Sequence, residues 1–178
     1  MENLVSLNLS GNPIFPLSSK IFNLKKLMTL YLRNCRLSGT IPPNIGELES
    51  MVDLDLSNNQ FIGPIPSSVS NLTNLSSLFL QSKQLNGSIP EDIGGLTNLV
   101  ELDLSSNWLS GHIPSSLGQL TNLGSLSNLR CLSMALNLLE GPIPHEIKSL
   151  KALKWLDLSD NKFSGSIPTQ IGNLSNLT

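Results

Sequence analysis

Four carboxylate side chains of this sequence are spaced so that they could share one surface and bind a cation. Asp53 and Asp55 are separated by one residue, and Glu101 and Asp103 repeat that spacing further along the chain. Side chains two residues apart in a strand point to the same face, so these four share a surface if each pair lies in a strand. Such a surface offers a cation site only if several oxygens converge on one ion. We therefore keep a cation-binding carboxylate cluster as the less favoured interpretation of these four residues.

The two histidines do not suggest a catalytic site. We expect neither His112 nor His145 to have a cysteine, a carboxylate or a metal-ligand spacing beside it, as a zinc site or a hydrolytic triad requires. The chain also lacks the glycine-rich phosphate loop and the catalytic aspartate motifs of a kinase. The sequence thus predicts no enzyme, no metal and no cofactor within these residues.

Composition narrows the class of partner. The chain has 178 residues, 13% of them charged, with a net charge of −2. This balance lacks the basic footprint of a nucleic-acid-binding protein. No apolar run approaches the roughly 18 residues of a membrane-spanning helix, and the first residues do not have the pattern of a secretory signal.

Internal repetition organises the whole sequence and defines the elements that carry these side chains. The pattern LxxLxLxxNxLxGxIPxxIGxLxx recurs seven times, with a step of 24 residues in most cases and of 30 residues between the fifth and sixth repeats. We interpret residues 1–178 as one repeat domain. The first positions of the repeats are Leu4, Leu27, Met51, Leu75, Leu99, Leu129 and Leu153.

Each position of the repeat has a physical role. Leucines at positions four and six alternate as in a strand and point inward, while positions three, five and seven face the other way. The asparagine at position nine can satisfy backbone groups at a bend. The glycine at position thirteen permits a positive φ or a close approach, and the following Ile-Pro favours an extended return segment. The predicted asparagine ladder is Asn12, Asn59, Asn107, Asn137 and Asn161.

The recurring segments, such as "LSGTIPPNIGEL", "LNGSIPEDIGGL" and "LSGHIPSSLGQL", resemble the plant-specific class of extracellular leucine-rich repeats. That class includes the ectodomains of plant receptor-like kinases and receptor-like proteins, and polygalacturonase-inhibiting proteins. The resemblance implies an α/β solenoid, a right-handed superhelix with one short parallel strand in each of about seven repeats. Its convex side is expected to be irregular or 3-10 helical.

Departures from the repeat carry further expectations. Position nine is Cys35 in the second repeat, where a small buried side chain fits. In the fourth repeat it is Lys83, whose amine we expect to reach the solvent at the rim of the solenoid. We therefore expect Lys83→Asn to raise the melting temperature. Cys35 and Cys131 are four repeats apart and too distant for a disulfide. The six extra residues at 123–128 suggest a widened coil.

The ends of the chain lack polar caps, so we expect a piece of a longer array. The open strand edges also predict end-to-end self-association.

The residues at positions three, five and seven form the predicted concave face. Exposed aromatic residues on a rigid sheet are efficient interface anchors, although single apolar residues on a surface are also ordinary. The candidate binding residues are Tyr31, Arg33, Phe79, Gln81, Glu101, Asp103, Arg130 and Trp155.

Six Asn-x-Ser/Thr motifs are candidate glycosylation sites if the protein is secreted. They are Asn8, Asn71, Asn74, Asn86, Asn173 and Asn176. The repeat itself generates such motifs, so their number does not establish the compartment.

The resemblance implies a module that recognises a peptide, a small ligand or a leucine-rich repeat co-receptor through the concave face of a plant cell-surface receptor. The parent protein would be extracellular and could carry a separate kinase domain. The alternative is a secreted inhibitor-like protein that binds a cell-wall-degrading enzyme. Arg33 and Arg130 are too far apart to clamp a peptide carboxylate together.

Overall fold

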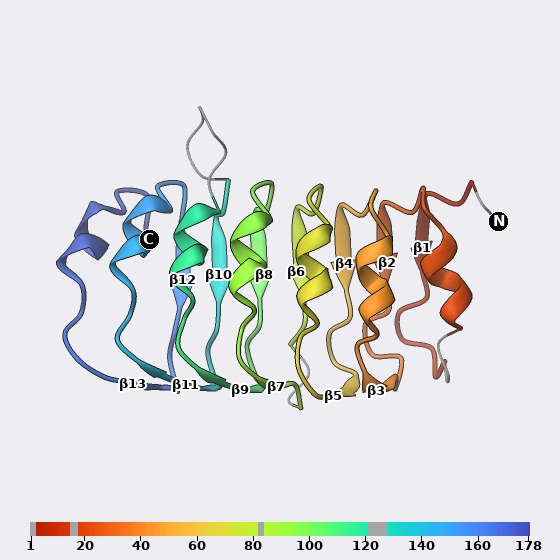
Figure 1. Ribbon diagram of the computed structural model, residues 1–178, viewed down its shortest axis with the longest axis horizontal. Coiled ribbons are helices and arrows are strands. Elements are labelled where there is room, and N and C mark those ends of the chain that lie inside the picture. Colours follow the sequence, from red (N-terminus) through yellow and green to blue (C-terminus); the bar gives the residue numbers. More distant parts are fainter. Residues whose placement is uncertain (1–2, 15–17, 82–83, 121–127) are drawn as a thin grey trace.

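The computed structural model describes residues 3–14, 18–81, 84–120 and 128–178 of the chain. Successive repeats stack side by side as the coils of a solenoid, with the strands of one long sheet behind a row of short helices (Figure 1). The sheet is parallel and has seven strands in chain order. They are β1 (Ser6–Asn8), β2 (Thr29–Tyr31), β4 (Asp53–Asp55), β6 (Ser77–Phe79), β8 (Glu101–Asp103), β10 (Cys131–Ser133) and β12 (Trp155–Asp157).

The leucine at position four keeps this sheet in register. Leu30 pairs with Leu54, which pairs with Leu78, and all three are fully buried. A slip of one residue would turn these leucines to solvent, so burial of one face fixes the pairing. Glu101 also pairs with Cys131, so the longer step between the fifth and sixth repeats leaves the register unchanged.

A second row of strands corrects the expectation of one strand per repeat. The extended segments that return from the sheet also pair with their neighbours in adjacent coils, because coils stacked in register bring equivalent backbone groups together. These strands are β3 (Ser38–Thr40), β5 (Gln60–Ile62), β7 (Asn86–Gly87), β9 (Trp108–Gly111), β11 (Leu138–Gly141) and β13 (Lys162–Phe163).

The glycine at position thirteen, which lies in or just after these strands, has a left-handed backbone, one of the two possibilities that the sequence left open. Gly111 and Gly141, for example, have φ values of 77° and 74°. A residue with a Cβ rarely adopts this conformation, so the glycine permits the bend without strain.

The side of the solenoid opposite the main sheet carries 3-10 helices, as expected. They are η1 (Ser19–Asn23), η2 (Pro43–Glu47), η3 (Ser67–Asn71), η4 (Glu91–Gly95), η5 (Ser115–Gln119), η6 (His145–Ser149) and η7 (Thr169–Asn173). Each of η2 to η6 buries an aliphatic side chain against the leucine core, as Ile45 and Ile93 do. The prolines before η2, η3, η5 and η6 have an extended backbone and direct the chain into the turn.

The asparagine ladder joins neighbouring coils through buried hydrogen bonds. The Asn59 amide nitrogen donates to the carbonyl oxygens of Leu32 and Leu56, at 2.7 and 2.9 Å. Its oxygen accepts the backbone N–H groups of Cys35 and Leu37, at 2.9 and 3.0 Å. One side chain therefore satisfies polar backbone groups in its own coil and in the coil before it.

Asn107, Asn137 and Asn161 repeat this arrangement by donating to Leu80, Leu104 and Met134 of the preceding coils. Asn12 differs, because it is exposed and bonds only within its own coil, to Leu9 and Ser10.

Candidate functional site

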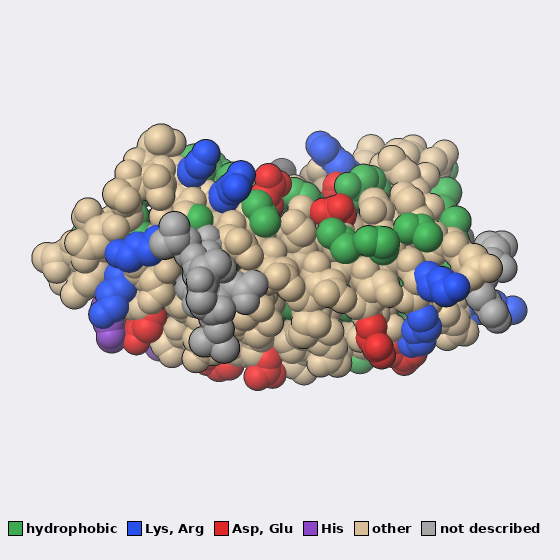
Figure 2. Space-filling model, turned by 90° about the horizontal axis from the view of Figure 1, so that it is seen from above, with side chains coloured by type: hydrophobic (Ala, Val, Ile, Leu, Met, Phe, Trp, Pro, Cys, Tyr) green, Lys and Arg blue, Asp and Glu red, His purple; other side chains and the backbone are tan. Residues whose placement is uncertain are grey.

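The candidate site is the face of the main sheet that points away from the core. In the view from above, hydrophobic, acidic and basic side chains gather along the margin of the molecule that carries this sheet, and the margin is hollowed near its middle (Figure 2). The short parallel strands hold these side chains in fixed columns, with neighbouring strands about 4.8 Å apart. The face is therefore a rigid array with one row per position of the repeat.

Aromatic and acidic residues alternate along the row at position five. Tyr31 pairs with Asp55, Asp55 with Phe79, and Phe79 with Asp103. Tyr31 and Phe79 are both partly exposed, and they lie two strands apart, or about 10 Å by the sheet spacing. The structure thus brings these two predicted aromatic residues into one row with a carboxylate between them.

The carboxylates of this row also have a structural role. One oxygen of Asp55 accepts the backbone N–H of Ser57 at 2.9 Å, and Asp103 makes the same contact with Ser105. These bonds close the turn that ends each strand. Asp103 therefore stabilises the scaffold, and its contribution to ligand binding stays a prediction.

The surroundings of Tyr31 change the pKa of its hydroxyl. Burial raises the pKa of its hydroxyl, and the nearby carboxylates Asp53 and Asp55 raise that pKa further. The phenol therefore stays a neutral hydrogen-bond donor at physiological pH.

The far end of the face has a different character. Trp155 is 47% exposed and lies in register with Cys131, which pairs in turn with Glu101. Burial and the Glu101 carboxylate raise the pKa of the Cys131 thiol, while Lys154 and Arg130 oppose that rise. Basic groups thus accompany the tryptophan, whereas carboxylates accompany Tyr31 and Phe79.

The candidate residues do not form one continuous patch. Trp155 lies three strands beyond Phe79 and belongs to position three. Arg33 is exposed at position seven, and Arg130 lies immediately before β10. The face is better described as two halves. The half on β2 to β8 is aromatic and acidic, whereas at the other half Arg130 and Lys154 precede β10 and β12 and Asp157 ends β12.

Three residues expected on the exposed columns are buried instead. Ser57, Ser133 and Ala135 are 0%, 3% and 5% exposed. The Ser57 hydroxyl and the side-chain oxygen of Gln81, another candidate residue, are both buried without a hydrogen-bond partner in the described part of the chain.

The six predicted glycosylation motifs all place their asparagine at the surface. Asn8 lies in β1 on the concave face, and Asn86 lies in β7. The side-chain amides of Asn74 and Asn176 donate hydrogen bonds to the preceding coil. Their acceptors are the backbone carbonyl oxygens of Glu49 and Lys151. Asn71 and Asn173 end the helices η3 and η7. Glycosylation itself stays a prediction.

The expectation for the histidines needs one correction. Glu146 does lie beside His145, with 3.3 Å between the His145 Nε2 and a carboxylate oxygen. The residues are adjacent in η6, and the histidine is exposed, so they form a surface pair rather than a triad. Within the described ranges, no three histidine, cysteine or acidic side chains are grouped to hold a metal ion.

The remaining expectations concern the two cysteines, the irregular repeats and membrane-spanning helices. Cys35 and Cys131 are free thiols, as predicted, and Cys35 is fully buried. Lys83 and residues 123–127 lie outside the described residues, so the expectations about them stay predictions. No helix in the part of the chain that the structure describes is long and apolar enough to cross a bilayer.

Sequence reasoning missed one group of surface residues, Trp108, Leu136 and Leu138. They are among the most exposed large hydrophobic side chains of the described residues. A signal was present, because position ten of the repeat is glutamine at Gln60 and Gln84 but apolar at Trp108 and Leu138.

The fold and the site define a leucine-rich repeat solenoid, a class of ligand-binding scaffold. The sequence matches the family described as "Leucine-rich repeat region" over residues 31–137, more than half of the chain. It also matches "Leucine Rich Repeat" over residues 3–24 and 152–174. The chain therefore belongs to the leucine-rich repeat family. Comparison with curated proteins finds no match.

Solved structures of plant receptors are similar to this chain. One is the ectodomain of the Arabidopsis thaliana membrane receptor kinase GASSHO1/SCHENGEN3 in complex with CASPARIAN STRIP INTEGRITY FACTOR 2. It has 42% identity and a TM-score of 0.86, and the match covers 90% of this chain and 19% of that one.

Two further receptors match over 99% of this chain. PEPR1, solved with AtPEP1, has 35% identity and a TM-score of 0.87, with 24% of its chain covered. The Arabidopsis receptor kinase HAESA, solved with the peptide hormone IDA and the co-receptor SERK1, has 34% identity and a TM-score of 0.85, with 33% covered. This chain thus spans 19% to 33% of the length of these relatives.

Proposed function

We propose that this chain is part of the extracellular ligand-binding region of a plant cell-surface receptor-like kinase or receptor-like protein. It recognises a peptide through its concave face and performs no catalysis itself. The observation that carries the proposal is the row Tyr31, Asp55, Phe79 and Asp103. Similar receptors solved with peptide ligands support it.

The chemistry of the row indicates the kind of peptide. Tyr31 and Phe79 offer apolar area whose position is fixed by the sheet, so little conformational entropy is lost on binding. Asp53 and Glu101 occupy the parallel row at position three and add negative charge. We expect the preferred peptide to place basic or polar groups between apolar side chains.

Calorimetric titration with known plant peptide hormones tests this proposal. CASPARIAN STRIP INTEGRITY FACTOR 2, AtPEP1 and IDA are suitable probes, because similar receptors were solved with them. For a peptide that binds, Tyr31→Ala and Phe79→Ala should each weaken affinity by at least about tenfold. Ile62→Ala is the matched control, because Ile62 is 48% exposed on β5, away from the main sheet.

Failure of all three peptides to bind would count against the proposal, as would a loss of affinity no larger than that of the control. Inhibition of a polygalacturonase by the intact chain, without peptide binding, would favour the inhibitor-like alternative.

A further inference from the structure

A second surface outside the concave face has the properties of a docking site. Trp108, Leu136 and Leu138 are 57%, 53% and 40% exposed. They come from the turns and return strands of the fifth and sixth coils and line one hollow of about 420 Å³. Ligand pockets commonly have volumes of about 300–1,000 Å³.

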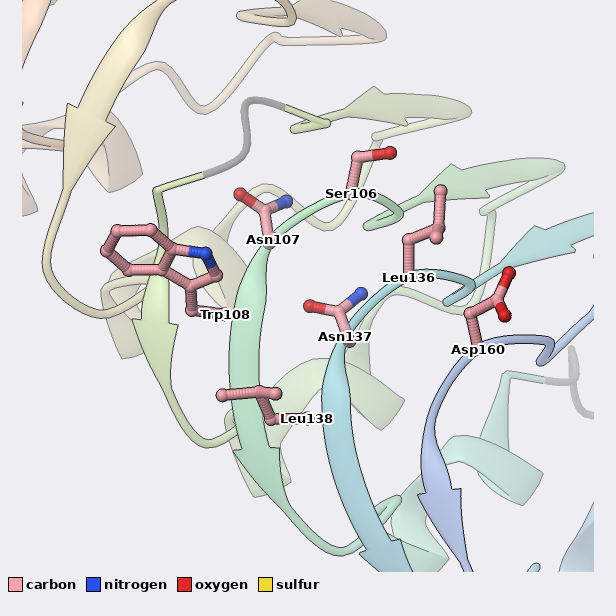
Figure 3. A pocket seen from close by; sticks show the side chains of 7 residues that line it. All are labelled: Ser106, Asn107, Trp108, Leu136, Asn137, Leu138 and Asp160. Atoms are coloured by element: carbon pink, nitrogen blue, oxygen red, sulfur yellow. The ribbon is translucent and has the colours of Figure 1, made fainter.

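The side chains of this hollow form two groups. Trp108 and Leu138 project to the same side from the neighbouring strands β9 and β11 (Figure 3). Leu136 projects from the turn before β11, with Asp160 from the next coil beside it. The apolar side chains of the hollow therefore lie near the Asp160 carboxylate.

The backbone conformation of Leu136 has an energetic cost. Its φ of 56° is left-handed, and the equivalent residues Asn34 and Asn58 have φ values of 55° and 54°. Asparagine tolerates this conformation, whereas a leucine there is strained. Its side chain is also exposed, so burial in the core does not compensate for the strain.

Among the polar side chains that line the hollow, the Asp160 carboxylate is available to bind a cation. Asn137 lines it, but its amide nitrogen donates to Leu104 and Met134, and its oxygen accepts the Leu109 N–H. The Asp160 carboxylate has no hydrogen bond or ion pair among the described residues. Lys162, two residues along, lies opposite Glu140 in the strand register.

We propose that the hollow of Trp108, Leu136, Leu138 and Asp160 binds a peptide segment of a partner protein that carries a bulky apolar side chain next to a lysine or arginine. The apolar side chain lies against Trp108 and Leu138, and the cation lies at the Asp160 carboxylate. Charge complementarity favours such a segment, because among the described residues the one charged side chain that lines the hollow, Asp160, is acidic.

Selection of a random peptide display library on the intact chain tests this proposal, followed by calorimetry with the enriched peptides. We expect the enriched sequences to share an apolar residue next to a basic one. Trp108→Gln, which copies the residue type of Gln60 and Gln84, should weaken their binding by at least about tenfold. Enrichment of sequences without this pairing, or binding that Trp108→Gln does not change, would overturn the proposal.

The contribution of Asp160 is tested by a double-mutant cycle. Asp160→Asn should weaken binding by about threefold, since an exposed ion pair contributes little. The same variant should have no effect on a peptide whose basic residue is replaced by alanine. An equal effect on both peptides would refute the predicted ion pair.

Leu136→Asn separates binding from folding. This variant copies Asn34 and Asn58, so it should raise the melting temperature while weakening peptide binding severalfold. A lower melting temperature would show that Leu136 stabilises the fold, and would remove the argument that its conformation is costly.

Two further results distinguish this site from other binding. Tyr31→Ala and Phe79→Ala should leave binding of these peptides unchanged, so the site can exist even if the proposed concave-face function fails. Binding of cellohexaose that depends on Trp108, without peptide enrichment, would identify a carbohydrate site and refute the peptide proposal.

Discussion

The thiol of Cys35 donates a hydrogen bond to the carbonyl oxygen of Leu9, at 3.2 Å. In the next coil Asn59 donates to Leu32, which occupies the position equivalent to Leu9. The cysteine thus replaces the donor function of the asparagine ladder. It lacks the acceptor function, and the Ile14 N–H instead bonds to the backbone carbonyl of Cys35, at 3.1 Å.

This contact predicts an order of stability at position 35. Cys35→Ala removes the donor and leaves a small cavity, and should lower the free energy of unfolding by about 1 kcal/mol. Cys35→Asn restores a donor for Leu9 and should be more stable than Cys35→Ala in urea denaturation. An asparagine variant less stable than the alanine variant would show that this coil has no room for the amide.

The ladder itself predicts a contrast between two asparagines. Asn59→Ala leaves the buried N–H groups of Cys35 and Leu37 without their acceptor, and should cost about 2–4 kcal/mol of unfolding free energy. Asn12→Ala removes only exposed bonds within one coil and should cost less than about 1 kcal/mol. Chemical denaturation of both variants measures the difference; equal costs would contradict the role given to burial.

Equivalent glycines in two 3-10 helices should respond differently to alanine. A Cβ on Gly46 would collide with the backbone oxygen of Ser68 in the next coil, whereas a Cβ on Gly172 meets nothing within 4 Å. Gly46→Ala should therefore lower stability by about 1–3 kcal/mol, and Gly172→Ala should raise it by at most about 1 kcal/mol. Thermal melts of the two variants test this, and an unchanged melting temperature for Gly46→Ala would disprove the close contact.

The single tyrosine allows the electrostatics of the concave face to be measured. Because the pKa of Tyr31 is raised above its ordinary value of 10.0, the unfolded chain loses this proton first as pH rises. The contribution of Tyr31 to stability is therefore complete below pH 10.0 and is lost as pH rises through the folded pKa.

Ultraviolet titration of tyrosinate in the folded protein should show that Asp55→Asn lowers the Tyr31 pKa. Asp157→Asn is the control, because Asp157 has the same place in β12, five strands from Tyr31. Equal pKa values in the two variants would exclude an influence of Asp55.

The repeat pattern predicted much of the fold. Leucines at positions four and six can be buried only if equivalent strands stack, so the parallel sheet and the identity of its inward residues followed from the sequence. The ladder followed as well, because a buried amide needs several partners and the bend supplies them.

The second row of strands was not predicted. Pairing between β9 and β11 depends on how far one coil is displaced from the next, and a motif within one repeat does not contain that displacement.

For the concave face, the sequence determined which residue types occupy each column, since strand periodicity assigns them. It did not determine their exposure, because exposure depends on the packing of the folded chain, in which Ser57 and Ser133 are 0% and 3% exposed. The hollow of Trp108, Leu136 and Asp160 likewise unites residues from three coils. Only the stacking of those coils sets their mutual distance, and so only the tertiary structure decided which surface side chains act together.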